Sequence, residues 1–146
     1  MANILLAVTG SISAYKAADI TSQLTKLGHQ LKVIMTPAAT AFITPLTLQV
    51  LSKNPVGLDV MIEEDPQRIE HIDIGKETDL FLVAPASANT IAKLAMGLAD
   101  NMVTSTALAL PQETKKILAP AMNTKMLEHP ATQRNLKLLQ DYDYQI

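Results

Sequence analysis

Short runs of consecutive apolar residues alternate along the chain with longer segments of helical periodicity. A strand that is apolar at every position is buried on both faces, and helices packed on the two sides of a sheet provide that burial. The alternation is typical of βαβ units. We therefore predict a three-layer α/β/α fold, Rossmann-like, with a doubly wound, mostly parallel sheet and the strand order 3-2-1-4-5-6. The predicted strands are 3–9, 30–36, 56–60, 80–85, 116–120 and 144–146.

Helical spacing marks the segments between these strands. Segment 13–27 stops at Gly28, a residue suited to a left-handed C-cap. Segment 130–141 opens on a proline, which is favoured in the first turn of a helix. Between residues 55 and 68, proline, glycine and an acidic cluster occur without any period, so we predict a mobile loop there. The other predicted helices are 45–52, 71–77, 88–96 and 101–110.

The composition limits the classes of function. A chain of 146 residues fits one domain, and its formal charge of −2 comes without a basic run, so nucleic acid is not an expected partner. The chain has no cysteine, which excludes a disulfide and a thiolate metal site, and we expect no metal. No apolar run approaches the roughly 20 residues that cross a bilayer, so we expect a cytoplasmic protein without a membrane partner. The apolar fraction of 48% favours self-association.

Small polar residues follow the first two predicted strands at their carboxyl ends, where open parallel sheets bind ligands. Gly10 permits close approach of the backbone, and Ser11 and Ser13 offer hydroxyls beside a helix start. The segment is a plausible anion cradle, although an ordinary N-cap explains it equally well. After the second strand, Thr36 could give its hydroxyl to a ligand or cap the following segment.

Two later strand ends carry similar residues. The segment 84–90 again puts small polar side chains and free backbone N–H groups at a helix start. Asn123 follows the fifth strand, with Met126 near, and could equally be a turn residue. The first loop lacks the G-x-G-x-x-G pattern, and the second strand lacks the acidic residue that holds a dinucleotide ribose. NAD is therefore not expected.

One of the three histidines is a candidate for chemistry. His29 lies in the turn before a strand and His129 lies beside a proline, so we expect both to be structural or exposed. His71 precedes the fourth strand and could point into the crevice as a proton-transfer group. A structural role remains the more common one for an isolated histidine.

Five motifs in the order found here resemble the homo-oligomeric flavin-containing cysteine decarboxylase family. They are VTGSISAYK at 8–16, HI at 71–72, APASANTIAK at 84–93, GLADN at 97–101 and PAMN at 120–123. Each motif is weak alone, whereas the ordered set is specific and extends over nearly the whole chain.

The resemblance implies FMN as cofactor and the decarboxylation of 4′-phosphopantothenoylcysteine to 4′-phosphopantetheine in coenzyme A biosynthesis, a carbon–carbon lyase reaction. It also implies that His71 is the catalytic histidine, that Asn123 positions the substrate carboxylate, and that the flavin lies at a subunit interface of a trimer or a multiple of trimers. The FMN-binding residues that it implies are Gly10, Ser11, Ile12, Ser13, Thr36, Phe42, Ser87, Ala88, Asn89, Thr90 and Ala121.

The sequence departs from the family in one respect. The family's decarboxylases usually have, after the Pro-x-Met-Asn motif, a flexible substrate clamp with a cysteine, whereas this sequence stops at Ile146 without one. We therefore expect residues 1–146 to form a single flavin-binding decarboxylase domain that lacks the clamp.

Three other functions are compatible with the same resemblance. A peptidyl-cysteine oxidative decarboxylase would act on a peptide and release an oxidised enethiol. A flavin prenyltransferase shares fold and cofactor, but the combination of His71 with the PAMN motif argues against it. A non-catalytic flavin-binding regulatory partner would be favoured by long acidic extensions, and the sequence has none.

Overall fold

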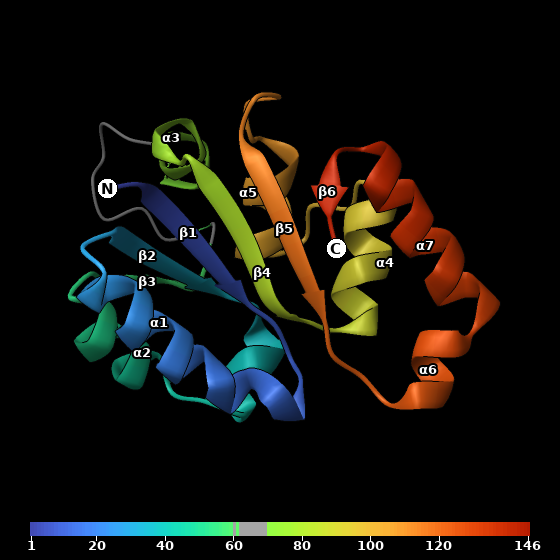
Figure 1. Cartoon of the computed structure of the whole chain (residues 1–146), viewed down its shortest axis with the longest axis horizontal. Coiled ribbons are helices and arrows are strands. Elements are labelled where there is room, and N and C mark those ends of the chain that lie inside the picture. Colours follow the sequence, from blue (N-terminus) through green and yellow to red (C-terminus); the bar gives the residue numbers. More distant parts are fainter. Residues whose placement is uncertain (60, 62–69) are drawn as a thin grey trace.

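A single parallel sheet forms the centre of the molecule (Figure 1). The structure, a computed structural model, describes residues 1–59, 61 and 70–146, the side chains of residues 70 and 71 excepted. Within these residues the sheet has six parallel strands in the order β3-β2-β1-β4-β5-β6, which confirms the predicted fold and strand order. The strands are β1 (Asn3–Val8), β2 (Gln30–Met35), β3 (Val56–Gly57), β4 (Leu80–Ala86), β5 (Lys115–Pro120) and β6 (Tyr144–Gln145).

Helices cover the two faces of the sheet unequally. One face carries the 3₁₀-helices η1 (Ile12–Tyr15) and η2 (Pro37–Ala41) together with α1 (Lys16–Lys26) and α2 (Pro45–Ser52), over β1 and β2. The other face carries α3 (Glu70–Glu77), α4 (Ala88–Met96), α5 (Met102–Leu108) and α7 (Pro130–Asp141), and the short α6 (Thr124–Glu128) joins β5 to α7.

Side chains of β1 explain why consecutive residues of a strand are apolar. Leu6 and Val8 point into the cluster beneath α1 and α2, whereas Leu5 and Ala7 point into the cluster formed with α4, α5 and α7. All four residues have 0% exposure. Because a fully buried side chain of this kind stabilises a fold by roughly 1.5–3 kcal/mol, both faces of the strand contribute to the core.

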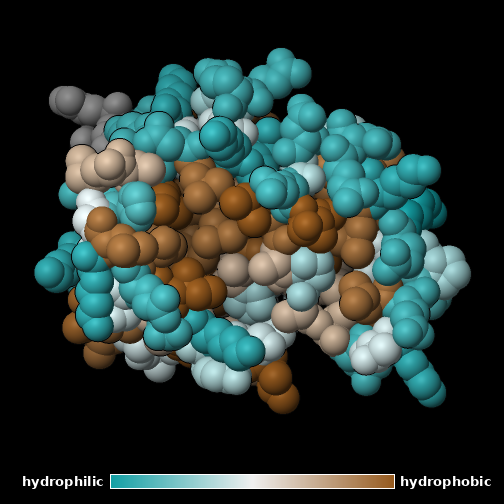
Figure 2. Space-filling view, viewed as in Figure 1, coloured by the Kyte–Doolittle hydropathy of each residue, from teal (hydrophilic) through white to brown (hydrophobic). Residues whose placement is uncertain are grey.

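The face over β4 and β5 is less completely covered. Figure 2 shows apolar surface that reaches solvent there, between α1 on one side and α4 and α7 on the other. Leu82 of β4 and Ile117 of β5 are register partners in this region, and both are only partly buried. The fold therefore leaves apolar strand surface open to an additional layer. None of the described helices has the length and apolar character needed to span a membrane.

Besides η2 and α6, which were not predicted from the sequence, the observed elements differ from the predicted ones in three main places. Segment 13–27 divides into η1 and α1, because Ser11 caps a 3₁₀ turn before the α-helix begins. The predicted helix 101–110 is shorter, because Asn101 is the N-cap of α5 rather than its first residue. The predicted strand 56–60 is reduced to β3, and residues 60 and 62–68 of the predicted loop lie outside the described residues.

Helix α1 ends in a Schellman motif at Gly28. The Gly28 N–H donates to the Thr25 carbonyl at 3.0 Å, and the His29 N–H donates to the Leu24 carbonyl at 3.3 Å. Gly28 has a φ of 92°, in the left-handed region that side chains disfavour. The left-handed C-cap predicted from the sequence is confirmed.

We expect Gly28→Ala to lower the free energy of unfolding by about 1 kcal/mol, measured by urea denaturation. A Cβ at this position would meet no atom within 4 Å, so the loss comes from backbone conformation alone. Gly28→Asn is the matched control, because asparagine tolerates the left-handed region and should lose less. An alanine variant as stable as the wild type would contradict this role for Gly28.

Candidate functional site

The chain leaves two adjacent strands, β1 and β4, in opposite directions. The segment after β1 enters η1 and α1 on one face, and the segment after β4 enters α4 on the other face. The strand order reverses at this point, and such a switch point opens a crevice at the carboxyl ends of the strands. The candidate site lies in this crevice.

Two adjoining hollows form the cleft. The polar hollow has a volume of about 390 Å³ and the apolar hollow a volume of about 520 Å³. Because both are lined by Gly10, Ser87, Ala88 and Met126, they are parts of one cleft. The polar hollow is further lined by Thr36, Pro37, Ala38, Asn89, Thr90, Lys93, Asp100 and Asn101, and the apolar hollow by Ser11, Ile12, Ser13, Phe42, Ala121, Met122 and Asn123.

Strand-end side chains around the cleft cap the helices that follow them. In each case a side-chain oxygen accepts a hydrogen bond from a backbone N–H in the first turn of the next helix, an interaction that typically contributes about 1 kcal/mol. The four caps that lie between a strand and the next helix at the cleft are Ser11 with the Ser13 N–H (3.2 Å), Thr36 with the Ala39 N–H (3.3 Å), Ser87 with the Thr90 N–H (3.2 Å) and Asn123 with the Lys125 N–H (2.9 Å).

The start of α4 provides donors to the polar hollow. The cap by Ser87 engages the Thr90 N–H, whereas the N–H groups of Ala88 and Asn89 belong to the first turn and have no intrahelical acceptor. Both residues line the polar hollow. Since the helix dipole also favours negative charge at this end, the helix start suits a phosphate group.

Thr9 connects β1 to this helix start. Its hydroxyl donates to the Pro85 carbonyl at 2.7 Å and accepts from the Ser87 N–H at 2.8 Å. Thr9 has 0% exposure and lines neither hollow. No role was predicted for Thr9 from the sequence. Its position directly after a run of apolar strand residues was the one feature that indicated a contact at the end of the strand.

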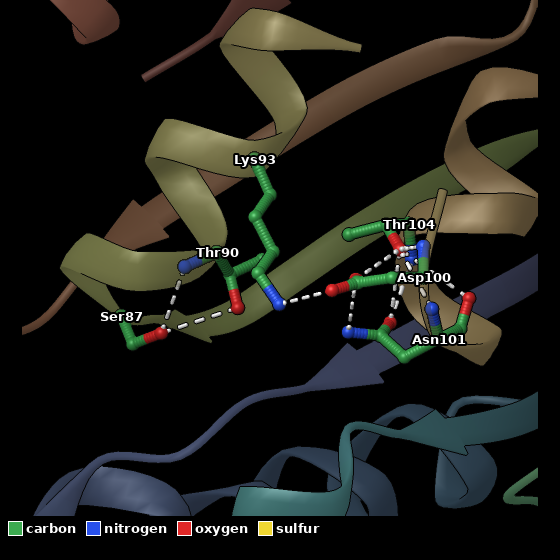
Figure 3. A network of polar contacts seen from close by, with 6 residues as sticks. All are labelled: Ser87, Thr90, Lys93, Asp100, Asn101 and Thr104. Atoms are coloured by element: carbon green, nitrogen blue, oxygen red, sulfur yellow. Dashed lines mark hydrogen bonds and ion pairs between the residues drawn. The ribbon is translucent and has the colours of Figure 1, made fainter. Parts of the chain in front are cut away.

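A network of polar contacts joins residues that line the polar hollow (Figure 3). The Lys93 ammonium lies 2.7 Å from an Asp100 carboxylate oxygen. The other carboxylate oxygen accepts from the Asn101 amide and the Thr104 hydroxyl, both at 3.4 Å. The hydrogen bond from Lys93 holds the pKa of Asp100 below its usual value. The GLADN motif thus provides a charged wall to the hollow.

The apolar hollow has exposed apolar side chains at its rim. Ile12 is 80% exposed, Phe42 50% and Met126 49%. Asn123 lies among them, and its side-chain oxygen accepts from the Lys125 N–H, so its amide NH₂ is left without a hydrogen-bond partner in the described part of the chain. This amide group can donate to a ligand in the hollow.

The structure brings the predicted cofactor residues together at the cleft, although their binding of FMN stays a prediction. The caps among them serve both as helix caps and as lining residues. The N–H of Ala121 donates to the Ala86 carbonyl at 3.1 Å, so it is not free for a ligand.

His71 lies in the first turn of α3, and its side chain is outside the described part of the chain. Lining residues that the sequence analysis did not assign are Pro37, Ala38, Lys93, Asp100, Asn101, Met122 and Met126.

Comparison with known proteins finds close relatives over nearly the whole chain. A family model described as Flavoprotein matches residues 1–146. The chain is 66% identical over 141 residues to a protein of Streptococcus mutans serotype c named "Probable phosphopantothenoylcysteine decarboxylase", with 97% of this chain and 79% of that protein covered. It is 47% identical over 142 residues to the coenzyme A biosynthesis bifunctional protein CoaBC of Bacillus subtilis, with 97% of this chain but only 34% of that protein covered.

Solved structures with the same fold include FMN-dependent cysteine decarboxylases and a PPC decarboxylase. The FMN-dependent cysteine decarboxylase SpaF is similar with a TM-score of 0.92 and 30% identity, covering 100% of this chain and 83% of that one. A PPC decarboxylase mutant complexed with pantothenoylaminoethenethiol is similar with a TM-score of 0.86 and 28% identity, covering 98% of this chain and 79% of that one.

We expect Gly10→Ala to disturb the cleft, because a Cβ on Gly10 would lie 2.6 Å from the Cβ of Ala38. Overpacking of this kind typically lowers the free energy of unfolding by about 1–3 kcal/mol, which thermal or urea denaturation measures. Adding Ala38→Gly removes the colliding atom and should restore much of the lost stability. A Gly10→Ala variant as stable as the wild type would contradict the close approach of these two loops.

Proposed function

Because the chain belongs to the flavoprotein family, we propose that it binds FMN and decarboxylates 4′-phosphopantothenoylcysteine to 4′-phosphopantetheine in coenzyme A biosynthesis. The family resemblance inferred from the sequence motifs is confirmed by the match over residues 1–146. The name of the Streptococcus mutans relative and the FMN-dependent structural neighbours support the reaction and the cofactor. The proposed enzyme is a carboxy-lyase, phosphopantothenoylcysteine decarboxylase.

The observation that carries the proposal is the division of the cleft into a polar and an apolar hollow. The phosphate of FMN is charged and its ring system is flat and largely apolar. A helix start with free N–H groups fits the phosphate, and the hollow bordered by Ile12, Phe42 and Met126 fits the ring. The residues present therefore fit this cofactor.

We assign the phosphate to the polar hollow. The N–H groups of Ala88 and Asn89 and the hydroxyls of Thr36 and Thr90 are its proposed donors, and the Lys93–Asp100 ion pair borders the same hollow. The ring system is assigned to the apolar hollow. The residues proposed to border it are Gly10, Ser11, Ile12, Ser13, Phe42, Ser87 and Ala121.

Asn123 is proposed to hold the substrate carboxylate. Its amide oxygen is fixed by the Lys125 N–H, so the NH₂ group has a defined orientation and can donate to an anion. When bound, FMN would accept a hydride from the carbon that bears sulfur, so that the resulting thioaldehyde can take up the electron pair left by CO₂, and the reduced flavin would then return the hydride. The protein's own contribution at this end is to orient the carboxylate.

His71 is proposed as the group that moves a proton at the substrate thiol. Helix α3, which contains His71, lies near the amino-terminal edge of the sheet, whereas α6, which follows Asn123, lies beyond the carboxyl-terminal edge (Figure 1). We therefore propose that His71 of the partner subunit completes the site in a trimer or a multiple of trimers. The apolar surface over β4 and β5 and the exposed side chain of Ile12 are consistent with such an assembly.

Two expectations from the sequence accompany this proposal. Residues 1–146 are proposed to be a single flavin-binding decarboxylase domain, and they span about a third of the bifunctional relative from Bacillus subtilis. A cytoplasmic location is the expected one for a step of coenzyme A synthesis.

One alternative is an oxidative decarboxylase of peptidyl cysteine, with which the likeness to the FMN-dependent cysteine decarboxylase SpaF is compatible. Identity argues against it, because the chain is 30% identical to SpaF but 66% identical to the Streptococcus mutans relative. Specificity for the substrate separates the two functions.

Incubation of the purified, FMN-loaded protein with 4′-phosphopantothenoylcysteine and, in parallel, with a peptide that ends in cysteine tests the proposal. We expect the first substrate to lose about 44 mass units, the mass of CO₂, and the peptide to remain unchanged. Mass spectrometry measures both. Turnover of the peptide alone would favour the alternative, and no change in either substrate would contradict both functions.

We expect Asn123→Asp to retain FMN and to lower kcat/KM by roughly 30-fold or more, because a hydrogen bond to a charged group contributes about 2 kcal/mol and the new carboxylate also repels the substrate. Aspartate preserves the cap on α6, so the fold should be unaffected. Flavin absorbance and the rate of CO₂ release are measured together.

The matching control is a mixture of subunits. Asn123→Asp and His71→Asn should each have strongly reduced activity alone, and a mixture that has exchanged subunits should regain part of the activity, because some sites then receive both original side chains. An active Asn123→Asp variant would contradict the role of Asn123, and a mixture without activity would contradict the shared site.

A further inference from the structure

We propose that Thr9 is a positioning residue that makes the cleft selective for a flavin with a phosphate group. It acts through Ser87 on the first turn of α4, and it touches neither the flavin nor the substrate. The inference rests on the proposed binding of FMN, and it adds the determinant of phosphate recognition.

Thr9 connects β1 to β4 beyond the point where their regular strand pairing ends. The last register pair between β1 and β4 is Ala7 with Val83, and the pairing of β4 with β5 shifts between Val83 and Ala86. Beyond this point the hydroxyl of Thr9 holds the chain, donating to the Pro85 carbonyl and accepting from the Ser87 N–H. The Thr9 N–H also donates to the Pro85 carbonyl, at a longer 3.3 Å.

The chemistry of this contact requires a hydroxyl. At 0% exposure, Thr9 has no access to bulk water, and its oxygen must donate one hydrogen bond and accept another at the same time. Serine can replace it and valine cannot, because valine would remove the acceptor of the Ser87 N–H and the donor to the Pro85 carbonyl. Without these two contacts the turn at residues 85–87 is held less firmly against the end of β1.

Movement of this turn would displace the phosphate donors. Ser87 is the N-cap of α4, and its own hydroxyl accepts from the Thr90 N–H at 3.2 Å. Ala88 and Asn89 follow directly, so the direction of their N–H groups depends on where Ser87 is held. Apart from Ser87 and Ala88, the residues that border the apolar hollow, such as Ile12 and Met122, belong to other segments. Loss of the Thr9 hydroxyl should therefore weaken the phosphate contact more than the ring contact.

Comparison of FMN with riboflavin, which has the same ring without the phosphate, tests the proposal on the full chain. The variants are Thr9→Val, Thr9→Ser and, as a control, Thr106→Val. Thr106 is also fully buried, but its hydroxyl has no hydrogen-bond partner among the residues that the structure describes, and it lies in α5 outside the cleft. Flavin fluorescence quenching gives a Kd for each ligand.

For Thr9→Val we expect the Kd of FMN to rise about tenfold or more while the Kd of riboflavin changes little, so that the preference for FMN falls. Thr9→Ser and Thr106→Val should keep the preference of the wild type. An unchanged ratio of the two Kd values in Thr9→Val, or an equal fall in Thr106→Val, would overturn the proposal.

Folding of the variant is checked by circular dichroism. If Thr9→Val does not fold, Thr9→Ala carries the same prediction, because its smaller side chain leaves room for the turn to relax. Failure of both to fold would also overturn the proposal, since the hydroxyl would then serve the fold rather than the ligand. A wild type that binds neither flavin would reject the proposed function itself, a result distinct from an unchanged ratio.

Discussion

The opposite routing of the chain after β1 and β4 is the constraint on which the site depends. Two parallel strands that lie side by side send their connections to opposite faces of the sheet, and the space between the connections cannot be filled by either. The hydroxyl of Thr9 bridges the two diverging segments at this point. The crevice is thus a consequence of strand order, and its chemistry comes from the few residues that follow each strand.

Capping and ligand binding use the same residues in this cleft. Ser11, Thr36, Ser87 and Asn123 each accept a hydrogen bond from the helix that they precede, and each also lines the cleft. A cap satisfies only one of the free N–H groups at a helix start and leaves others for a ligand. For asparagine, the cap also fixes which end of the amide faces outward. The two interpretations that the sequence left open, helix cap or ligand contact, are therefore compatible.

Sequence patterns predicted the architecture because it rests on local signals. Consecutive apolar residues located the strands, and Gly28 marked the end of α1 through its backbone conformation. The contacts that shape the cleft could not be predicted in this way. Thr9 lies 78 residues from Ser87, and the Lys93–Asp100 pair forms only because the chain turns at Gly97, whose φ is 72°. The family resemblance identified the segments that meet at the cleft, but not the hydrogen bonds that orient them.

A crystal structure of the protein with FMN bound tests the central claim most directly. The account predicts that phosphate oxygens lie within hydrogen-bonding distance of the N–H groups of Ala88 and Asn89, with the flavin ring in the hollow that contains Asn123. A phosphate bound away from the start of α4, or a ring that occupies the polar hollow instead, would contradict it.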